Sequence, residues 1–242
     1  MSKQIYRFEF KYDINPRQAY LIERDIKKFG MKPDPNIVSG TGEYFVTSLY
    51  YDSHDLSDYR DKAGGFIKRK KIRARIYEPY LAKSDFVWLE IKHRFGPKNS
   101  KTRVKLSRPE FDRFIVDRDG VLLFKDWGED IDKKNDILWN FIKTSVKPKI
   151  AVRYKRRAFM NDVGDLRITF DSNLETCPKT DLNCVQPMVS VNSGRLAMEI
   201  KFCYLIPSWL KVIIEDYGLK TDTYSKYEKS SEAIYRYNPL LR

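Results

Sequence analysis

Alternation of apolar and charged residues, with a period of two, recurs along the chain. In Lys71–Ile76, KIRARI, three basic side chains alternate with three apolar ones. This is the period of a β-strand, so such a segment has one apolar and one charged face. The same pattern is found in Tyr6–Tyr12, Val87–Lys92, Leu166–Asp171 and Met198–Phe202. The chain is therefore predicted to contain at least five strands of this kind.

Helical spacing of apolar residues is found between these strands. Pro16 suits a first helical turn, and Gln18–Phe29 carries apolar or aromatic residues at 19, 22, 26 and 29 before Gly30, a stop signal. Four further helices are predicted: one opened by Pro109, one over Asp132–Val146, one from Pro207 to Gly218, and one over Ser225–Tyr237. Strands and helices intermix over the whole length. The sequence therefore predicts a single α+β domain over residues 1–242.

The composition excludes a disordered chain and indicates an anionic partner. Hydrophobic residues make up 42% of the 242 residues, and 46 Lys+Arg against 33 Asp+Glu give a net charge of +13. The longest apolar stretch, Tyr204–Ile214, is interrupted by Pro207 and Lys211, so no membrane-spanning helix is expected. The amino terminus has no apolar signal region, and three cysteines do not suggest a disulfide framework. A cytoplasmic, reduced protein is expected.

The charged strand faces differ from ordinary solvent-facing ones. Solvent faces mix Ser, Thr, Gln, Lys and Glu, whereas these faces repeat Arg and Lys with a single carboxylate. An antiparallel sheet with its charged face in water is one interpretation. The other is a β-barrel with the charged faces inward, which would enclose a cationic lumen and leave its apolar outer surface to be covered by helices.

A cationic lumen that contains a few carboxylates suits a polyphosphate substrate. Arginine binds phosphate oxygens with a planar fork, and lysine neutralises them as a point charge. Glu9, Glu90, Asp171 and Glu199 each lie on the charged face of a separate predicted strand. If several of them converge, they would hold Mg²⁺ or Mn²⁺, which bridges to phosphate. Alternatively, each carboxylate simply pairs with a neighbouring Arg or Lys.

Other chemistries find little support in the sequence. The glycine patterns of P-loop and dinucleotide-binding folds are absent, and Gly64–Gly65 suits a turn. His54 and His93 have no partner at metal-ligand spacing, and Cys177 and Cys184 lack the spacing of a zinc site. With two histidines, no catalytic triad is predicted.

Nine motifs, taken in order, resemble the VTC domain family. They are RFEFKY (7–12), SLYYD (48–52), KIRARIY (71–77), LEIKHR (89–94), KTRVK (101–105), YKRRA (154–158), RITFD (167–171), MEIKF (198–202) and SKY (225–227). The family consists of polyphosphate polymerase domains within the triphosphate tunnel metalloenzymes, related to the CYTH superfamily. The resemblance covers nearly the whole chain.

The resemblance implies an antiparallel eight-stranded β-barrel, the triphosphate tunnel, with helices packed outside. It also implies transfer of the terminal phosphoryl group of ATP to a polyphosphate chain with a divalent metal, Mn²⁺ or Mg²⁺. The catalytic residues implied are Arg73, Arg75, Arg156, Arg167 and Lys226. The phosphate-binding residues implied are Arg7, Lys11, Lys92, Arg103, Lys201 and Ser225, of which Ser225 could also cap a helix. The resemblance makes Glu199 the principal metal ligand, beside the other candidate ligands Glu9, Glu90 and Asp171.

One position departs from the wider superfamily, whose signature opens with two carboxylates. Arg7 stands at the first of them, which fits the VTC branch and argues against thiamine triphosphatases and adenylate cyclases. Two alternatives stay open: a triphosphatase of the same fold, and a non-catalytic polyphosphate- or RNA-binding module. The partners expected are ATP and polyphosphate, not nucleic acid. A membrane-protein partner is inferred only by analogy with eukaryotic members, and the oligomeric state is not predicted.

Overall fold

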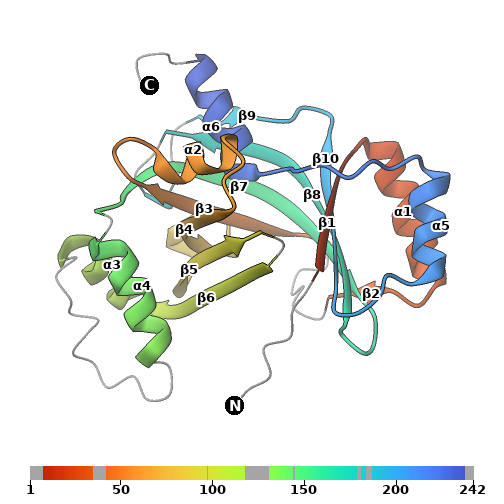
Figure 1. Cartoon of the computed structure of the whole chain (residues 1–242), viewed down its shortest axis with the longest axis horizontal. Helices are drawn as coiled ribbons and strands as arrows, with labels where there is room; N and C mark the ends of the chain where they lie inside the picture. The colour runs from red at the N-terminus through yellow and green to blue at the C-terminus, as the bar shows by residue number, and fades with distance from the viewer. Residues whose placement is uncertain are drawn as a thin grey trace. The chain divides into compact units, whose positions relative to one another are not determined.

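A computed structural model describes residues 8–34, 42–96, 98–117, 131–143, 145–178, 181–183 and 187–237. Within these ranges the chain is an α+β protein with a large antiparallel sheet and six α-helices (Figure 1). The eight longer strands follow the order β1-β10-β8-β7-β3-β4-β5-β6. The strands are β1 Phe8–Ile14, β2 Lys32–Pro33, β3 Tyr44–Asp52, β4 Lys68–Ile76, β5 Phe86–Phe95, β6 Lys98–Ser107, β7 Lys147–Met160, β8 Leu166–Cys177, β9 Val189–Ser190 and β10 Leu196–Phe202. The helices are α1 Pro16–Lys28, α2 Ser57–Ala63, α3 Arg108–Asp117, α4 Ile131–Lys143, α5 Ser208–Asp216 and α6 Lys226–Tyr237, with a 3-10 turn at Leu81–Lys83.

The chain forms two compact units, which are described separately below. Unit 1 consists of residues 1–45, 154–175 and 190–229, and unit 2 of residues 46–153, 176–189 and 230–242. Each unit is assembled from three stretches of chain, so the boundary does not follow a linker. The single domain over residues 1–242 and the closure of the sheet into a tunnel both stay predictions.

Unit 1 packs helices α1 and α5 against one face of its sheet. Ile22 and Ile26 of α1 are fully buried in a core that also holds Ile200 of β10. The predicted helix start is confirmed: Asn15 accepts a hydrogen bond from the amide of Gln18, whose side chain bonds back to the Asn15 amide, and Pro16 occupies the first turn. The two helices lie side by side (Figure 1), and Phe29 after α1 stacks on Trp209 of α5 with ring centroids 4.7 Å apart.

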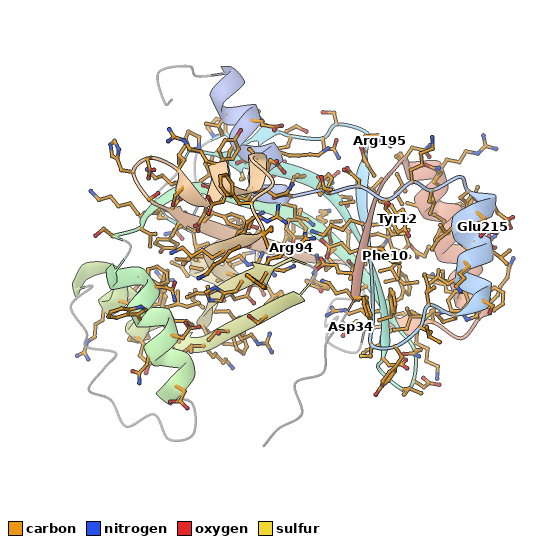
Figure 2. The ribbon with its side chains drawn as sticks, in the orientation of Figure 1. Phe10, Tyr12, Asp34, Arg94, Arg195 and Glu215 are labelled. Atoms are coloured by element: carbon orange, nitrogen blue, oxygen red, sulfur yellow. The ribbon has the colours of Figure 1, made fainter. Side chains whose placement is uncertain are left out.

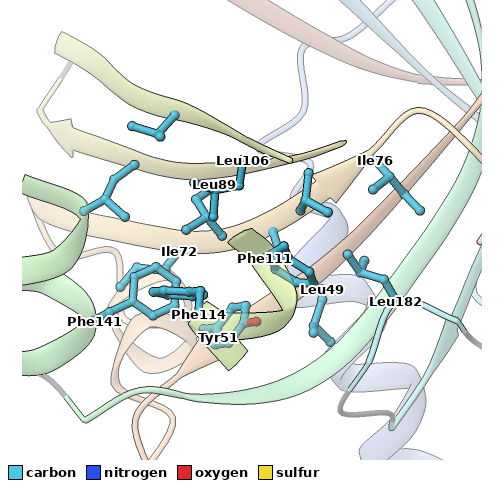
Figure 3. Packing of buried hydrophobic residues seen from close by; sticks show 14 of the residues in the cluster. Leu49, Tyr51, Ile72, Ile76, Leu89, Leu106, Phe111, Phe114, Phe141 and Leu182 are labelled. Carbon is cyan, nitrogen blue, oxygen red and sulfur yellow. The ribbon is translucent and has the colours of Figure 1, made fainter. Parts of the chain in front are cut away.

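Unit 2 buries its apolar core under α3 and α4. Leu49, Ile72 and Leu89, from three neighbouring strands, are fully buried in it (Figure 3). Phe141 of α4 closes this core, because its ring lies edge-on to Phe114 of α3, at 4.9 Å between centroids. The predicted helices opened by Pro109 and over Asp132–Val146 therefore exist, as Arg108–Asp117 and Ile131–Lys143.

The alternation predicted from the sequence is confirmed in the strands. In β4, Ile72, Ala74 and Ile76 are all fully buried on the core face. The expected strands from Lys71, Val87, Leu166 and Met198 are present with wider bounds, and the first strand is described from Phe8 onward. Gly64–Gly65 forms the expected turn, with Gly65 at φ +70. Cys177 and Cys203 are free thiols, and Cys184 lies outside the described residues.

Helix α2 was not predicted from the sequence. Leu56, the residue before it, adopts φ 58, a left-handed conformation that few side chains favour. The helix start is instead held by Asp52 at the end of β3, whose carboxylate accepts hydrogen bonds from the amides of Asp58 at 3.0 Å and Tyr59 at 3.1 Å. This capping explains the aspartate of the SLYYD motif in structural terms.

Asp58 should make the stability of the chain depend on pH. Its side chain is buried, and its Oδ2 has no hydrogen-bond partner within the described part of the chain. Burial together with the charge of Asp52 raises its pKa to about 7. A folded-state pKa above the unfolded value means that folding becomes less favourable as pH rises from about 4 to about 7. Asp58→Asn is therefore expected to raise the free energy of unfolding at pH 8 by on the order of 2 to 4 kcal/mol, with the difference vanishing near pH 4. Urea unfolding at both pH values measures it, and equal stabilities at pH 8 would contradict it.

Candidate active site

The odd-numbered residues of three paired strands in unit 1 share one face of the sheet. In the observed register, Glu199 of β10 lies between Lys11 of β1 and Thr169 of β8. One step along, Lys201 lies between Glu9 and Arg167. Figure 2 labels Phe10 and Tyr12, which belong to the opposite, even-numbered face of β1. The strand pattern thus places charged side chains from separate motifs next to one another.

Three of these positions, Asp171, Glu199 and Lys201, form an ion network with Arg156 of β7 and Lys226 at the start of α6. Arg156 of β7 donates to both carboxylate oxygens of Asp171, at 2.6 and 2.7 Å. Lys226 Nζ bridges two carboxylates, at 2.6 Å from Asp171 Oδ2 and 3.0 Å from Glu199 Oε1. Lys201 Nζ lies 3.0 Å from Glu199 Oε2. We call Arg156, Asp171, Glu199, Lys201 and Lys226 the Glu199 network.

Mutual attraction keeps these groups charged in spite of their burial. Burial opposes ionisation of Glu199, but Lys201 and Lys226 hold its pKa well below its usual value. Burial likewise opposes the charge of Lys226, whereas Asp171 and Glu199 hold its pKa well above its usual value. Charged groups that are held in fixed positions away from water can stabilise the charge that develops in a transition state.

Aromatic rings support the cations of the network. Lys226 Nζ lies 4.9 Å from the ring centroid of Tyr154 and 5.6 Å from that of Tyr224. The guanidinium carbon of Arg156 lies 5.3 Å from the Tyr154 centroid. An aromatic ring attracts a cation through its face but carries no net charge. These contacts therefore position Lys226 and Arg156 and leave their positive charges available to an anion.

The other predicted residues of unit 1 surround the network. Lys11 donates to the carbonyl oxygen of Tyr224 at 3.0 Å and lies 3.5 Å from Glu9 Oε1. Ser225 Oγ accepts from the amide of Glu228 at 3.3 Å, so it caps α6 as expected. Arg167 forms an ion pair with buried Asp34. Arg7 lies outside the described residues.

Thr169 is a residue that the sequence reasoning missed. It lies on the same face of β8 as Arg167 and Asp171 and opposite Glu199. The residue is 1% exposed, and its hydroxyl has no hydrogen-bond partner among the residues that the structure describes. A buried hydroxyl without a partner is costly in a finished fold. Its position beside the Glu199 network makes it a candidate contact for a bound anion.

Unit 2 contains a second ion network, centred on Glu90 of β5. Arg73 of β4 reaches Glu90 Oε2 with Nε and Nη2, both at 2.7 Å. Arg75 Nη1 lies 3.7 Å from the same oxygen and Arg75 Nε donates to Ser48 Oγ at 3.0 Å. Lys101 of β6 pairs with the other oxygen. We call Arg73, Arg75, Glu90 and Lys101 the Glu90 network.

Three cations share one carboxylate in this network. Burial opposes the charge of Glu90, but Arg73, Arg75 and Lys101 hold its pKa well below its usual value. Burial of its ammonium group, followed by the two arginines, lowers the pKa of Lys101 to about 7 against the attraction of Glu90. The network therefore has an excess of positive charge, which a bound polyanion would neutralise.

The remaining phosphate-binding candidates of unit 2 lie on the same sheet face. Lys92 lies opposite both Lys71 and Lys101. Arg103 lies opposite Glu90 and its guanidinium carbon is 4.3 Å from the Trp88 ring centroid. Like charges directly opposite each other destabilise a sheet. The register thus places Lys71, Lys92 and Lys101 next to one another on one face of the sheet.

The predicted metal ligands do not form one cluster. Among the described residues, no group of three or more His, Cys, Asp or Glu side chains could hold a metal ion. Asp171 and Glu199 come together, bridged by Lys226. The contacts of Glu90 match the alternative in which a carboxylate pairs with basic neighbours. Glu9, near Lys11, lies at the edge of the Glu199 network.

Several residues in or beside the two networks were not predicted. They are Asp34, Ser48, Tyr154, Thr169, Tyr224 and Lys101. Lys101 opens the KTRVK motif, and Tyr154 opens YKRRA. Membership of these motifs was the sequence signal that could have identified Lys101 and Tyr154. Asp34 lies in none of the nine motifs.

The sequence matches one protein family over almost its whole length. The VTC domain matches residues 6–235. The chain belongs to the VTC domain family. This VTC domain is part of the triphosphate tunnel family, and its match spans both networks. No curated protein matches the sequence.

A solved structure shares the fold of this VTC domain. A crystal structure from Bacillus halodurans, described as a candidate adenylate cyclase, superposes with a TM-score of 0.52 at 13% identity, over 93% of this chain and 96% of that one. At that identity the likeness shows the fold alone. No helix in the described part of the VTC domain is long and apolar enough to cross a membrane.

Proposed function

We propose that the chain is a metal-dependent polyphosphate polymerase, which transfers the terminal phosphoryl group of ATP to a growing polyphosphate chain inside a cationic tunnel. The observation that carries the proposal is the Glu199 network. It brings together two carboxylates and three basic side chains from one sheet face and the start of α6. Membership of the VTC family, which implies a triphosphate substrate, supports the same conclusion.

The basic side chains suit a triphosphate. Arg73 and Arg75 are held through Glu90 and Ser48, so their planar forks are oriented before a ligand arrives. Arg156 is oriented in the same way by Asp171. We assign Arg73, Arg75, Lys92 and Arg103 to the triphosphate of ATP, and Arg156, Arg167 and Lys226 to the transferred phosphoryl group or the chain. Lys11, Lys201 and Ser225 are assigned to phosphate binding beside them, together with Arg7, whose structure is not described.

Asp171 and Glu199 fit a divalent cation. The Lys226 ammonium already bridges their carboxylates, so these oxygens converge on a position that a cation occupies. Mg²⁺ is commonly held by one or two carboxylates, with waters and substrate phosphates as the other ligands. A divalent cation there would offset the charge on the phosphate oxygens in the transition state. Lys226 and Lys201 would then contact phosphate oxygens in place of the carboxylates. Glu9 is a further candidate ligand of the metal.

The transfer needs no general base. A terminal oxygen of the polyphosphate chain forms a bond to the γ-phosphorus while the bond from that phosphorus to its bridging oxygen breaks, so ADP leaves and the chain gains one phosphate. The attacking oxygen is already an anion and has no proton to lose. The fixed guanidinium and ammonium groups stabilise the charge on the equatorial oxygens, which accounts for an active site without histidine.

Thr169→Val tests whether the charged face of β8 contacts a bound phosphate. Valine has nearly the shape of threonine and replaces a hydroxyl for which the described ranges of the chain offer no hydrogen-bond partner. The free energy of unfolding is expected to stay the same or rise by about 1 kcal/mol. Turnover of ATP should fall about tenfold if the hydroxyl contacts a phosphate oxygen. Thr223→Val, at an exposed position of the same unit, is the control. Unchanged turnover in Thr169→Val would contradict the assignment.

The products of ATP turnover test the function itself. Purified protein is incubated with ATP and Mn²⁺ and the products are separated by length. Long-chain polyphosphate with ADP is the expected result. Release of inorganic phosphate alone would assign a triphosphatase. Binding of polyphosphate without turnover, unaffected by EDTA, would assign a non-catalytic module.

A further inference from the structure

Three large apolar side chains are exposed at one end of the β4–β5 ribbon in unit 2. The exposed fractions are 60% for Phe66, 68% for Ile67 and 64% for Phe95. None of them belongs to the buried core under α3 and α4. An exposed apolar cluster of this kind marks an interaction site more often than a scattered single residue does. We call Gly64–Ile67 together with Phe95–Gly96 the ribbon tip.

The backbone ties the ribbon tip into one structure. The amide of Gly96 donates to the carbonyl of Ile67 at 3.0 Å, and Lys68 lies directly opposite Phe95. The Phe66 ring lies against Gly64, where an added Cβ would be 2.7 Å from a ring carbon. These contacts hold the apolar side chains in place without covering them.

The apolar side chains project from both faces of the ribbon. Residues directly opposite in an antiparallel pair share a face, and neighbours along a strand alternate. Lys68 and Phe95 lie directly opposite and share a face. The alternation, continued one residue beyond the start of β4, places Ile67 on the other face. A flat partner surface covers only one face, whereas a lipid interface surrounds an inserted tip.

Positive charge surrounds the ribbon tip. Lys68 and Arg94 are both exposed, and Arg69 lies directly opposite Arg94 in the ladder. The stretch Lys62–Lys70 has four Lys or Arg and no Asp or Glu. Opposed like charges cost stability in a sheet, and an anionic surface offsets that cost.

We propose that the ribbon tip binds the surface of an anionic lipid membrane. Phe66, Ile67 and Phe95 enter the interface, and Lys68 and Arg94 contact the phosphates of the headgroups. Apolar side chains and basic side chains together give the two signals that peripheral attachment requires. This inference does not depend on the polymerase activity, and it would attach the chain to a membrane through the ribbon tip.

Vesicle sedimentation tests the proposal with the full chain. The vesicles are phosphatidylcholine alone, or phosphatidylcholine with about one third phosphatidylglycerol. The protein is expected to sediment with the anionic vesicles, less so at high salt, and only weakly with phosphatidylcholine. The double variant Phe66→Ser/Ile67→Ser should lose at least about tenfold in affinity, and Lys68→Gln/Arg94→Gln a similar factor.

The matched control is Tyr204→Ser/Leu205→Ser, because these two side chains of unit 1 are 73% and 86% exposed but lie outside the ribbon tip. It should bind vesicles like the natural sequence, and all variants should keep the same ATP turnover and unfolding midpoint. The proposal is overturned by no binding to anionic vesicles, by equal binding to both vesicle types, or by equal binding of the ribbon-tip variants. A protein partner would be assigned instead by two results together. The natural sequence would not bind lipid but would bind a purified membrane protein, and the ribbon-tip variants would lose that binding.

Discussion

Glu199→Gln is expected to lower ATP turnover at least about 100-fold while the chain stays folded. Glutamine keeps an oxygen that accepts from Lys226, but it removes the negative charge that faces Lys201 and Lys226. Asp171 still pairs with Arg156 and Lys226 in the variant. The stability cost should therefore be limited to about 1 to 3 kcal/mol. Steady-state kinetics together with urea unfolding measure both quantities.

Glu215→Gln is the matched control for this variant. Glu215 belongs to α5 of the same unit and is exposed (Figure 2). The substitution removes the same charge, so turnover and stability should stay as in the natural sequence. Turnover in Glu199→Gln within a few-fold of the natural rate would show that Glu199 is structural, as would a turnover loss that follows the loss of folded protein.

Glu90→Gln is expected to destabilise the chain by about 3 kcal/mol or more at pH 7, because Arg73 and Arg75 lose the buried carboxylate that they share. The folded-state pKa of Glu90 lies below its unfolded value. Its contribution to stability is thus present above about pH 4 and is lost as the pH falls further. Urea unfolding across this range should show a difference between variant and natural sequence that shrinks on acidification.

Added tripolyphosphate should restore part of the stability of Glu90→Gln, since the polyanion would take the place of the carboxylate beside Arg73, Arg75 and Lys101. Asp112→Asn is the comparison, because it breaks an exposed ion pair with Arg108 at 3.0 Å and should cost no more than about 1 kcal/mol. If Glu90→Gln and Asp112→Asn cost the same, or if tripolyphosphate has no larger effect on Glu90→Gln, the Glu90 network does not bind a polyanion.

Local patterns in the sequence predicted most of the elements. The alternation in KIRARI and RITFD follows from a strand that buries one face, and Ile72 and Ile168 are indeed fully buried. Pro16 and Gly30 mark α1 because proline suits a first turn and glycine accepts φ +78. Helix α2 was missed because it is capped by Asp52, a residue of the preceding strand, and follows a left-handed Leu56.

The candidate site was predicted in its residue types but not in its pairings. Alternation shows that Glu90 and Glu199 lie on charged faces, yet it does not give the register between strands. The register decides that Glu90 lies opposite Arg73 and Arg103, and that Glu199 lies opposite Lys11 and Thr169. The ion pair of Asp34 with Arg167 joins residues far apart in the sequence and has no local signature.

Anomalous diffraction tests most directly whether the Glu199 network binds the metal and the phosphates. Crystals are soaked with Mn²⁺ and a non-hydrolysable ATP analogue, and the manganese is located from its anomalous signal. We expect a peak in contact with the Glu199 carboxylate, with Asp171 beside it and with Lys201 or Lys226 in contact with a phosphate oxygen. A manganese peak elsewhere, with the ion pairs of Lys226 to Asp171 and Glu199 unchanged, would contradict this expectation.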